Sequence, residues 1–177
     1  MGLTVRAATA DDAGALAEVA AATFALACPP HVTQASIDAF IAQVLSQVCF
    51  ERYLGDDARD VLVAEDGGQA VGYAMTVAGD PTDADVSAAV RHRPAVELSK
   101  IYVLPHGHGS GAARELMAAA LETARSRGAA AVWLGVNQLN ERAQKFYRKN
   151  GFRQVGTKRF LVGDRYEDDY VYEQVLS

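Results

Sequence analysis

The chain has 177 residues, of which 50% are hydrophobic, and its formal net charge is −5. This length suits one domain over residues 1–177 with a full hydrophobic core, and the negative charge argues against a nucleic-acid partner. No apolar run approaches the roughly 20 residues that span a bilayer, and the N-terminus lacks the basic start and apolar stretch of a signal peptide. We therefore expect a cytoplasmic protein without a membrane partner, whose two cysteines, Cys28 and Cys49, are reduced.

The first half of the chain predicts three strands, two of them joined by a hairpin turn, and two helices. Residues 3–7 alternate as a short strand, and Thr9 with Asp12 indicates a capping box before a helix over about 11–24. After a break at "CPPH", apolar residues recur at helical spacing over 37–48. Strands are expected over 59–66 and 70–79 around a tight turn at "GGQ". The polar segment 80–94 is expected to be a mobile loop.

The second half predicts a strand over 95–104, a helix over 109–126 and a strand over 130–137. Such a βαβ unit has parallel strands. A helix over 140–149 and a hairpin of strands 152–163 and 165–176 complete the chain. The fold class is therefore a mixed α/β domain, and a ligand is expected beyond the carboxyl ends of the parallel strands.

The stretch "IYVLPHGHGSGAAREL" places three glycines between an apolar strand and a helix. A helix N-terminus offers unpaired backbone N–H groups and a partial positive charge, and glycines let a bulky anion approach them. This pattern favours a phosphate cradle, although the glycines are also compatible with a turn that needs them for geometry alone. A nucleotide-triphosphate loop would need Lys-Ser or Lys-Thr after Gly111, where the chain has "AAR", and a dinucleotide fingerprint would need another glycine spacing.

Two motifs resemble the Gcn5-related N-acetyltransferases (the GNAT family), which bind acetyl-CoA. The family's pyrophosphate loop, Gln/Arg-x-x-Gly-x-Gly/Ala, is matched by "HGHGSG", with His106 in the Gln/Arg place. The second signature is matched by "WLGVNQLNERAQKFYRKNGF". The resemblance implies a central mixed sheet of about seven strands flanked by helices and acetyl-CoA as co-substrate.

The resemblance also implies where the acetyl-CoA contacts lie. Val103 would pair with the pantetheine arm through its backbone. Asn140 has a second reading as the N-cap of its own helix. The full set of expected cofactor-binding residues is Ile101, Tyr102, Val103, His106, Gly107, His108, Gly109, Ser110, Gly111, Ala112, Asn137, Asn140, Ala143, Phe146 and Tyr147. No metal is expected, since His106 and His108 on one loop are too few ligands.

The expected catalytic residues are Tyr147 and Glu97. The resemblance places the Tyr147 hydroxyl near the CoA sulfur, where it would protonate the departing thiolate; the alternative is ordinary packing on one helical face with Ala143 and Phe146. Glu97 lies within an apolar strand, where a carboxylate is costly unless it is wet or paired. It is the candidate base, with an ion pair to Lys100 or Arg93 as the alternative. Alternation places Glu97, Ile101 and Val103 on one face unless a bulge intervenes.

The expected reaction is acetyl transfer to a primary amine of a small molecule. The C-terminal pattern around Gly156, Phe160, Gly163 and Val171 resembles the polyamine acetyltransferase branch typified by PaiA, and seven acids could attract a polycation: Asp80, Asp83, Asp85, Asp164, Glu167, Asp168 and Asp169. Alternatives are a protein or peptide amine, an amino-acid analogue, an antibiotic, or a non-catalytic acyl-CoA-binding module. The acceptor would be selected by residues 25–58 and 80–94, and a homodimer is possible.

Overall fold

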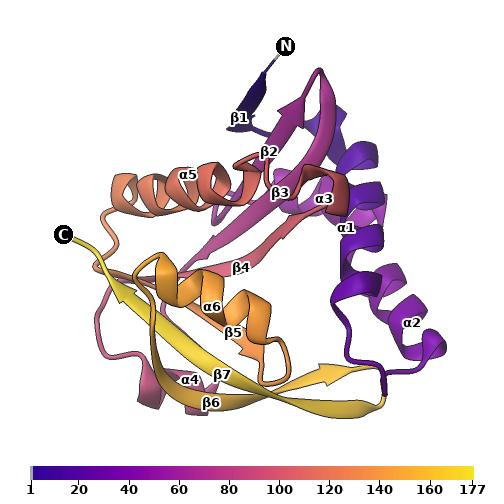
Figure 1. Ribbon diagram of the computed structural model, residues 1–177. Helices are drawn as coiled ribbons and strands as arrows, with labels where there is room; N and C mark the ends of the chain where they lie inside the picture. Colours follow the sequence, from indigo (N-terminus) through magenta and orange to yellow (C-terminus); the bar gives the residue numbers. More distant parts are fainter. Residues whose placement is uncertain (1) are drawn as a thin grey trace.

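Figure 1 presents the computed structural model of the chain, which describes residues 2–177 apart from the side chain of Phe160. Within this part, seven strands form one mixed sheet in the order β1-β2-β3-β4-β5-β7-β6. This is the fold class predicted from the sequence. Met1, the first residue of the predicted domain, lies outside the described residues. The strands are β1 (Leu3–Ala7), β2 (Arg59–Asp66), β3 (Gln69–Ala78), β4 (Ala95–Val103), β5 (Ala131–Asn137), β6 (Arg153–Val162) and β7 (Arg165–Val175).

Helices cover both faces of this sheet (Figure 1). One face packs against α5 and α6, and Leu116 and Met117 of α5 are fully buried against it. The other face packs against α1, α2 and α3 around Leu16 and Phe50, each of which contributes about 1.5–3 kcal/mol by its burial. The helices are α1 (Ala13–Ala27), α2 (Gln34–Val44), α3 (Gln47–Leu54), α4 (Ala84–Ala89), α5 (Ala112–Ser126) and α6 (Glu141–Lys149), with 3₁₀ turns η1 (Ala10–Asp12) and η2 (Pro105–Gly107).

The parallel pairing of β4 with β5 confirms the predicted βαβ unit. It is short, because the described residues pair only from Ala95 opposite Ala131 to Glu97 opposite Trp133. Beyond this point β4 stays paired with β3 and β5 stays paired with β7. The carboxyl halves of β4 and β5 therefore diverge, and the backbone edges that face each other across the gap are left for a ligand.

A bulge in β4 overturns one prediction from alternation. The register with β3 shifts between Met75 and Thr76, so Ser99 is an extra residue in β4. Ile101 and Val103 still pack toward α5, but Glu97 does not share their face. The extra residue reverses the side-chain direction along the strand.

The bulge instead places Glu97 on the same side of the sheet as Lys100 and Tyr102. Val96 and Leu98, which flank Glu97, belong to the cluster under α5, so the Glu97 side chain points to the opposite face. Tyr102 packs on that opposite face, with α1.

Two helices differ from the prediction. The helical pattern over 37–48 is divided at Ser46, whose hydroxyl accepts a hydrogen bond from the backbone N–H of Cys49 and begins α3. Segment 80–94, expected to be a loop, contains α4. Asp83 caps α4 by accepting from two backbone N–H groups, and Val86 and Val90 are fully buried against Trp133.

Most other boundaries follow the sequence. The capping box of Thr9 and Asp12 is present, and it starts a 3₁₀ turn that continues into α1. The β2–β3 turn uses Gly67 and Gly68 at positive φ, as a tight hairpin requires. Helix α5 begins at Ala112 rather than at Gly109, because Gly109 and Gly111 have φ values of +84° and +90°.

Candidate active site

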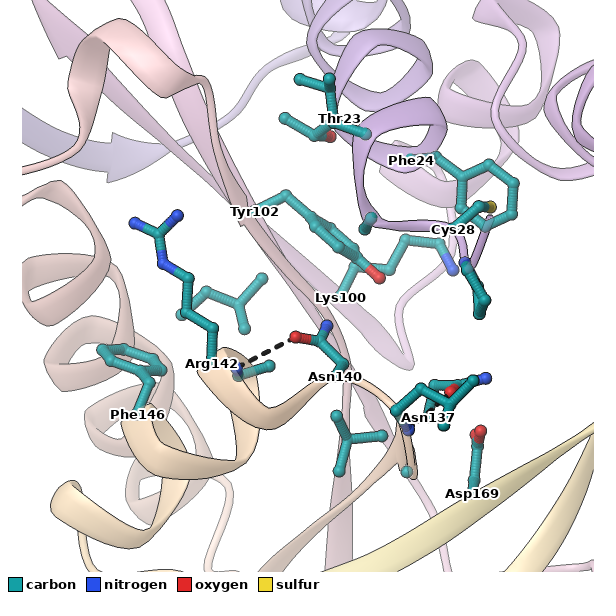
Figure 2. Close-up of a pocket in the computed structure, with 18 of the residues that line it drawn as sticks. Thr23, Phe24, Cys28, Lys100, Tyr102, Asn137, Asn140, Arg142, Phe146 and Asp169 are labelled. Carbon is teal, nitrogen blue, oxygen red and sulfur yellow. Dashed lines mark hydrogen bonds between the residues drawn. The ribbon is translucent and has the colours of Figure 1, made fainter. Parts of the chain in front are cut away.

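A cavity of about 780 Å³ opens where β4 and β5 diverge. Its walls come from β4 and β5, from the start of α6, from the C-terminal end of α1 and from the β6–β7 hairpin. Figure 2 shows Tyr102 and Lys100 on one side, Asn137 and Asn140 on the other and Asp169 at the base. Segments that are far apart in sequence therefore form the walls of one cavity.

The structure brings most of the predicted site residues together. Glu97 and Tyr147 line the cavity with Ile101, Tyr102, Val103, His108, Asn137, Asn140, Ala143 and Phe146. The remaining predicted residues lie in or beside the glycine loop that precedes α5: His106, Gly107, Gly109, Ser110, Gly111 and Ala112. Ala113, in the first turn of α5, connects this loop to the cavity wall.

The glycine loop suits an anion at the N-terminus of α5. An added Cβ at Gly109 would meet nothing within 4 Å, so the space above the loop is open. Ser110 stiffens the turn, since its hydroxyl donates to the Gly107 carbonyl (2.5 Å) and accepts from the Ala112 N–H (3.2 Å). The next N–H groups of the first helical turn have no partner within the helix. The predicted phosphate cradle therefore has a backbone that fits, and His106 is exposed at its edge.

His108 has a structural role that the sequence did not indicate. Arg142 Nη2 donates to His108 Nδ1 (2.9 Å), which makes that nitrogen the acceptor. The proton is then on Nε2, which donates to the Val103 carbonyl (3.0 Å). Arg142 also lines the cavity and was missed, because nothing in its helical spacing distinguishes it from a solvent-exposed arginine. The Val103 carbonyl thus already accepts one hydrogen bond, and its second lone pair is the one a ligand would use.

Tyr147 packs in an aromatic cluster beside the cavity, and its role as an acid stays a prediction. Its ring packs against Phe146, Phe152 and Tyr172, with centroid distances of 5.7, 6.0 and 6.4 Å. It also lines the cavity. Burial raises the pKa of Tyr147 well above its usual range, and the neighbouring Tyr102 adds to the rise. The hydroxyl is therefore protonated at neutral pH.

Asn140 is the N-cap of α6, as one reading predicted. Its side-chain oxygen accepts from the Ala143 N–H (3.1 Å), and the residue still lines the cavity. Gln144, one turn later, donates to the backbone carbonyls of Asn137 and Gln138. These bonds fix the β5–α6 connection and so hold the wall of the cavity in place.

Glu97 and Lys100 form the polar centre of the β4 wall. Burial raises the pKa of Glu97, and the charges of Lys158, Lys100 and Arg59 oppose that rise. Burial lowers the pKa of Lys100 to about 8, and Glu97 counteracts this. Arg93, the other predicted partner of Glu97, instead interacts with Asp80 and the Ser87 carbonyl.

A second buried carboxylate, Asp169 on β7, was not among the predicted catalytic residues. Its side chain lines the cavity and is 5% exposed. Burial raises the pKa of Asp169 to about 6; Lys158 opposes the rise, and Glu167 and Asp168 reinforce it. The strand pattern in "RYEDDYVYE" indicates that alternate acids share a face, but not which face is buried.

A contact between two distant segments lies beside the cavity. His31, in the connection after α1, is 2.8 Å from Oε1 of Glu167 on β7. Asn137 donates to the same oxygen (3.3 Å). Of the seven acids expected to attract a polycation, only Glu167 and Asp169 line the cavity. None of the described residues of 80–94 does so, whereas Phe24, Cys28 and Pro30 at the end of α1 do.

The sequence model of the Acetyltransferase (GNAT) family matches residues 23–152. This chain belongs to the GNAT family. Uncharacterized N-acetyltransferase Rv2669 of Mycobacterium tuberculosis (strain ATCC 25618 / H37Rv) is 49% identical over 165 residues, which cover 93% of this chain and 98% of that protein. An uncharacterized N-acetyltransferase of Archaeoglobus fulgidus is 33% identical over 106 residues, covering 59% of this GNAT chain and 67% of the relative.

Solved structures show the same fold. PaiA N-acetyltransferase from Thermoplasma acidophilum, in complex with coenzyme A, superposes with a TM-score of 0.79 at 17% identity, covering 99% of this chain and 100% of the other. Ribosomal-protein-alanine N-acetyltransferase from Brucella melitensis superposes with a TM-score of 0.73 at 26% identity, covering 98% and 99%. The protein is therefore a GNAT-family N-acetyltransferase, and the likeness to PaiA concerns the fold alone.

Two searches of the described residues bear on membranes and metals. No helix within residues 2–177 is both long enough and apolar enough to span a bilayer. Over the same residues, no three His, Cys, Asp or Glu side chains are grouped as metal ligands would be.

Proposed function

We propose that this cytoplasmic enzyme transfers the acetyl group of acetyl-CoA directly to a primary amine of a small molecule. The observation that carries the proposal is the divergence of β4 and β5, which joins the glycine loop to a cavity holding Tyr147, Glu97 and Asp169. A PaiA structure with the same fold contains coenzyme A, which supports acetyl-CoA as the co-substrate.

The residues around the divergent strands fit coenzyme A. The open backbone at Gly109, Gly111 and the first turn of α5 would hold the pyrophosphate. The β4 edge around Val103 would hydrogen-bond the pantetheine amides, as an added strand does. The bound thioester would supply the activated acetyl group, and the protein residues would orient it and exclude water.

Tyr147 and Glu97 are proposed for the proton transfers. Tyr147 would donate its hydroxyl proton to the sulfur as the carbon–sulfur bond breaks, which avoids the release of a free thiolate. Glu97 is the base suggested by the sequence. Asp169, on the opposite side of the cavity, is a second carboxylate for the same role, and the choice between them is argued below.

The cavity supports an amine acceptor but mixes charges of both signs. Glu97, Glu167 and Asp169 are balanced in part by Lys100 and Lys158. A polyamine therefore stays one candidate among small amines. A peptide amine is the second candidate, because a structure at 26% identity is that of a ribosomal-protein-alanine N-acetyltransferase. A homodimer stays a prediction.

A thiol-release assay with acetyl-CoA tests the proposal. The acceptors would be spermidine, tyramine, glucosamine, phosphinothricin and a peptide with an N-terminal alanine, each with an amine-free control. We expect amine-dependent release of CoA with at least one small molecule. Release with the alanine peptide alone, or with no amine of this set, would overturn the small-molecule acceptor.

A further inference from the structure

Asp169 is a buried anion with one oxygen left without a partner. Its Oδ1 atom is inaccessible to solvent and has no hydrogen-bond partner among the described residues. An unpaired buried carboxylate is costly, and such groups gather at functional sites. Figure 2 shows the carboxylate at the base of the cavity, below Asn137 and directed into the space that Lys100 and Tyr102 face from the other side.

The sequence makes room for this carboxylate at Gly135 on β5. A Cβ at Gly135 would lie 3.3 Å from Asp169 Oδ2 and 3.3 Å from Lys158 Cδ. Lys158 is paired with Asp169 across β6 and β7, and its side chain extends over the glycine. The missing side chain therefore leaves the space that the Asp169 and Lys158 side chains occupy, at a position that lines the cavity.

The charged and titratable groups that line this cavity include Lys158 on β6, Glu167 on β7, Glu97, Lys100 and Tyr102 on β4, and Cys28 after α1. Asp168 acts on Asp169 from the exposed face of β7, and His31 contacts Glu167. Glu167 is already bonded by His31 and Asn137.

Glu97 and Asp169 differ in their surroundings. Three cations, Lys158, Lys100 and Arg59, act on Glu97 and favour its ionised form. Lys158 is the one cation that acts on Asp169, and two further acids raise its affinity for a proton. Of the two carboxylates, Asp169 is the one that a ligand's positive charge would complement best.

We propose that Gly135, Lys158 and Asp169 form the acceptor subsite, in which Asp169 binds the substrate as an alkylammonium ion and removes its proton. This inference rests on the proposed function and assigns the base to β7 instead of to Glu97. Asp169 lies across the gap from β4, so an amine bound there would approach a thioester held along β4 from the open side.

The proton balance is complete with the groups present. Asp169 takes one proton from the ammonium ion, and the neutral nitrogen forms a bond to the acetyl carbon. The carbon–sulfur bond then breaks, and Tyr147 protonates the sulfur. The nitrogen's second proton restores the Tyr147 hydroxyl, and Asp169 returns its proton to solvent, so that the products are an amide, CoA thiol and one proton.

The test compares Asp169→Asn with Asp168→Asn. Asp168 is the adjacent residue on the exposed face, so the control removes the same charge without entering the cavity. With the best acceptor of the thiol-release assay, we expect kcat/KM of Asp169→Asn to fall by about a hundredfold or more at pH 7, typical of a lost base. Asp168→Asn should stay within about twofold, since it lies outside the cavity, as surface substitutions usually do.

The pH profile separates a base from a structural group. In the wild type, kcat/KM should rise with pH to a plateau above about pH 6 as Asp169 ionises. Asp169→Asn should instead keep rising toward the amine's own pKa, because it depends on amine that is already neutral. Retention of the acidic limb in Asp169→Asn would overturn the assignment.

A binding measurement tests the subsite without turnover. In the CoA-bound protein, ¹³C NMR would follow the carboxyl groups while n-butylammonium chloride is added. The Asp169 signal should titrate at a lower pH with the ammonium ion present, because a nearby cation favours the carboxylate. A shift at Glu97 with none at Asp169 would overturn the proposal. Absence of amine-dependent thiol release by the wild type would refute the proposed function, whereas release that Asp169→Asn leaves intact would refute this inference alone.

Discussion

The hydroxyl of Tyr147 can be separated from its ring by the change Tyr147→Phe. The ring contacts with Phe152 and Tyr172 are retained, and no hydrogen bond of the hydroxyl occurs among the described residues. Stability should therefore change little. If the hydroxyl protonates the sulfur, the single-turnover rate should fall about a hundredfold, which corresponds to about 2.7 kcal/mol of transition-state stabilisation.

Tyr172→Phe is the matched control in the same aromatic cluster. The Tyr172 hydroxyl accepts from Arg148 (3.0 Å) and donates to Gln144 (3.4 Å), and the residue is fully buried. Loss of these two bonds should cost about 1–2 kcal/mol and lower Tm by about 2–8 °C. The rate of acetyl transfer should stay close to that of the wild type.

The two variants are compared by thermal unfolding and by single-turnover transfer, since slow product release would mask a slower chemical step. We expect Tyr147→Phe to lose rate without stability and Tyr172→Phe to lose stability without rate. A Tyr147→Phe protein that transfers acetyl groups as fast as the wild type would refute the acid role and leave the packing role.

Three further outcomes follow from the structure. Gly109→Val and Gly67→Val should each destabilise the protein by about 1–2 kcal/mol, because φ is +84° at Gly109 and +61° at Gly67. Only Gly109→Val should also abolish the rise in Tm that acetyl-CoA causes. An unchanged rise in Tm would show that the pyrophosphate does not bind at this loop. Asp169→Asn should be more stable than the wild type above pH 6 by roughly 2–3 kcal/mol in urea unfolding, since the folded-state pKa of about 6 lies above the unfolded value. The gain should vanish below about pH 4, and a gain that is independent of pH would contradict a buried charge as its cause. Ser46→Ala should cost about 1 kcal/mol in the same assay by removing the α3 cap, and wild-type stability would show that the cap is dispensable.

Local patterns were sufficient to predict most of the secondary structure, and they indicated the loop that we propose for the cofactor. Alternation and helical spacing predicted the seven strands, because one-sided burial imposes these periods on any sheet or helix. The glycine loop was identifiable because three glycines directly before a helix N-terminus form a local pattern that suits anion binding. The cap at Asn140 was also predicted from a local pattern, an asparagine at the start of a helix.

Long-range packing determined the parts that the sequence left open. Segment 80–94 contains a helix because Val86 and Val90 are buried against Trp133. This burial is not a local property of the sequence. The face of Glu97 depends on a bulge whose position is set by pairing with β3.

The proposed acceptor subsite depends on the tertiary structure alone. Asp169, Lys158 and Gly135 come from three strands, and each has an ordinary reading in its own segment. Their chemistry arises only when the sheet order places β5 next to β7 and the β4–β5 gap beside both. The sequence by itself was sufficient to predict the family and the fold class and to indicate the loop proposed to bind phosphate, because those depend on neighbouring residues. Burial of the Asp169 carboxylate was decided by the assembled sheet, because the removal of water from a charge requires side chains from the whole fold.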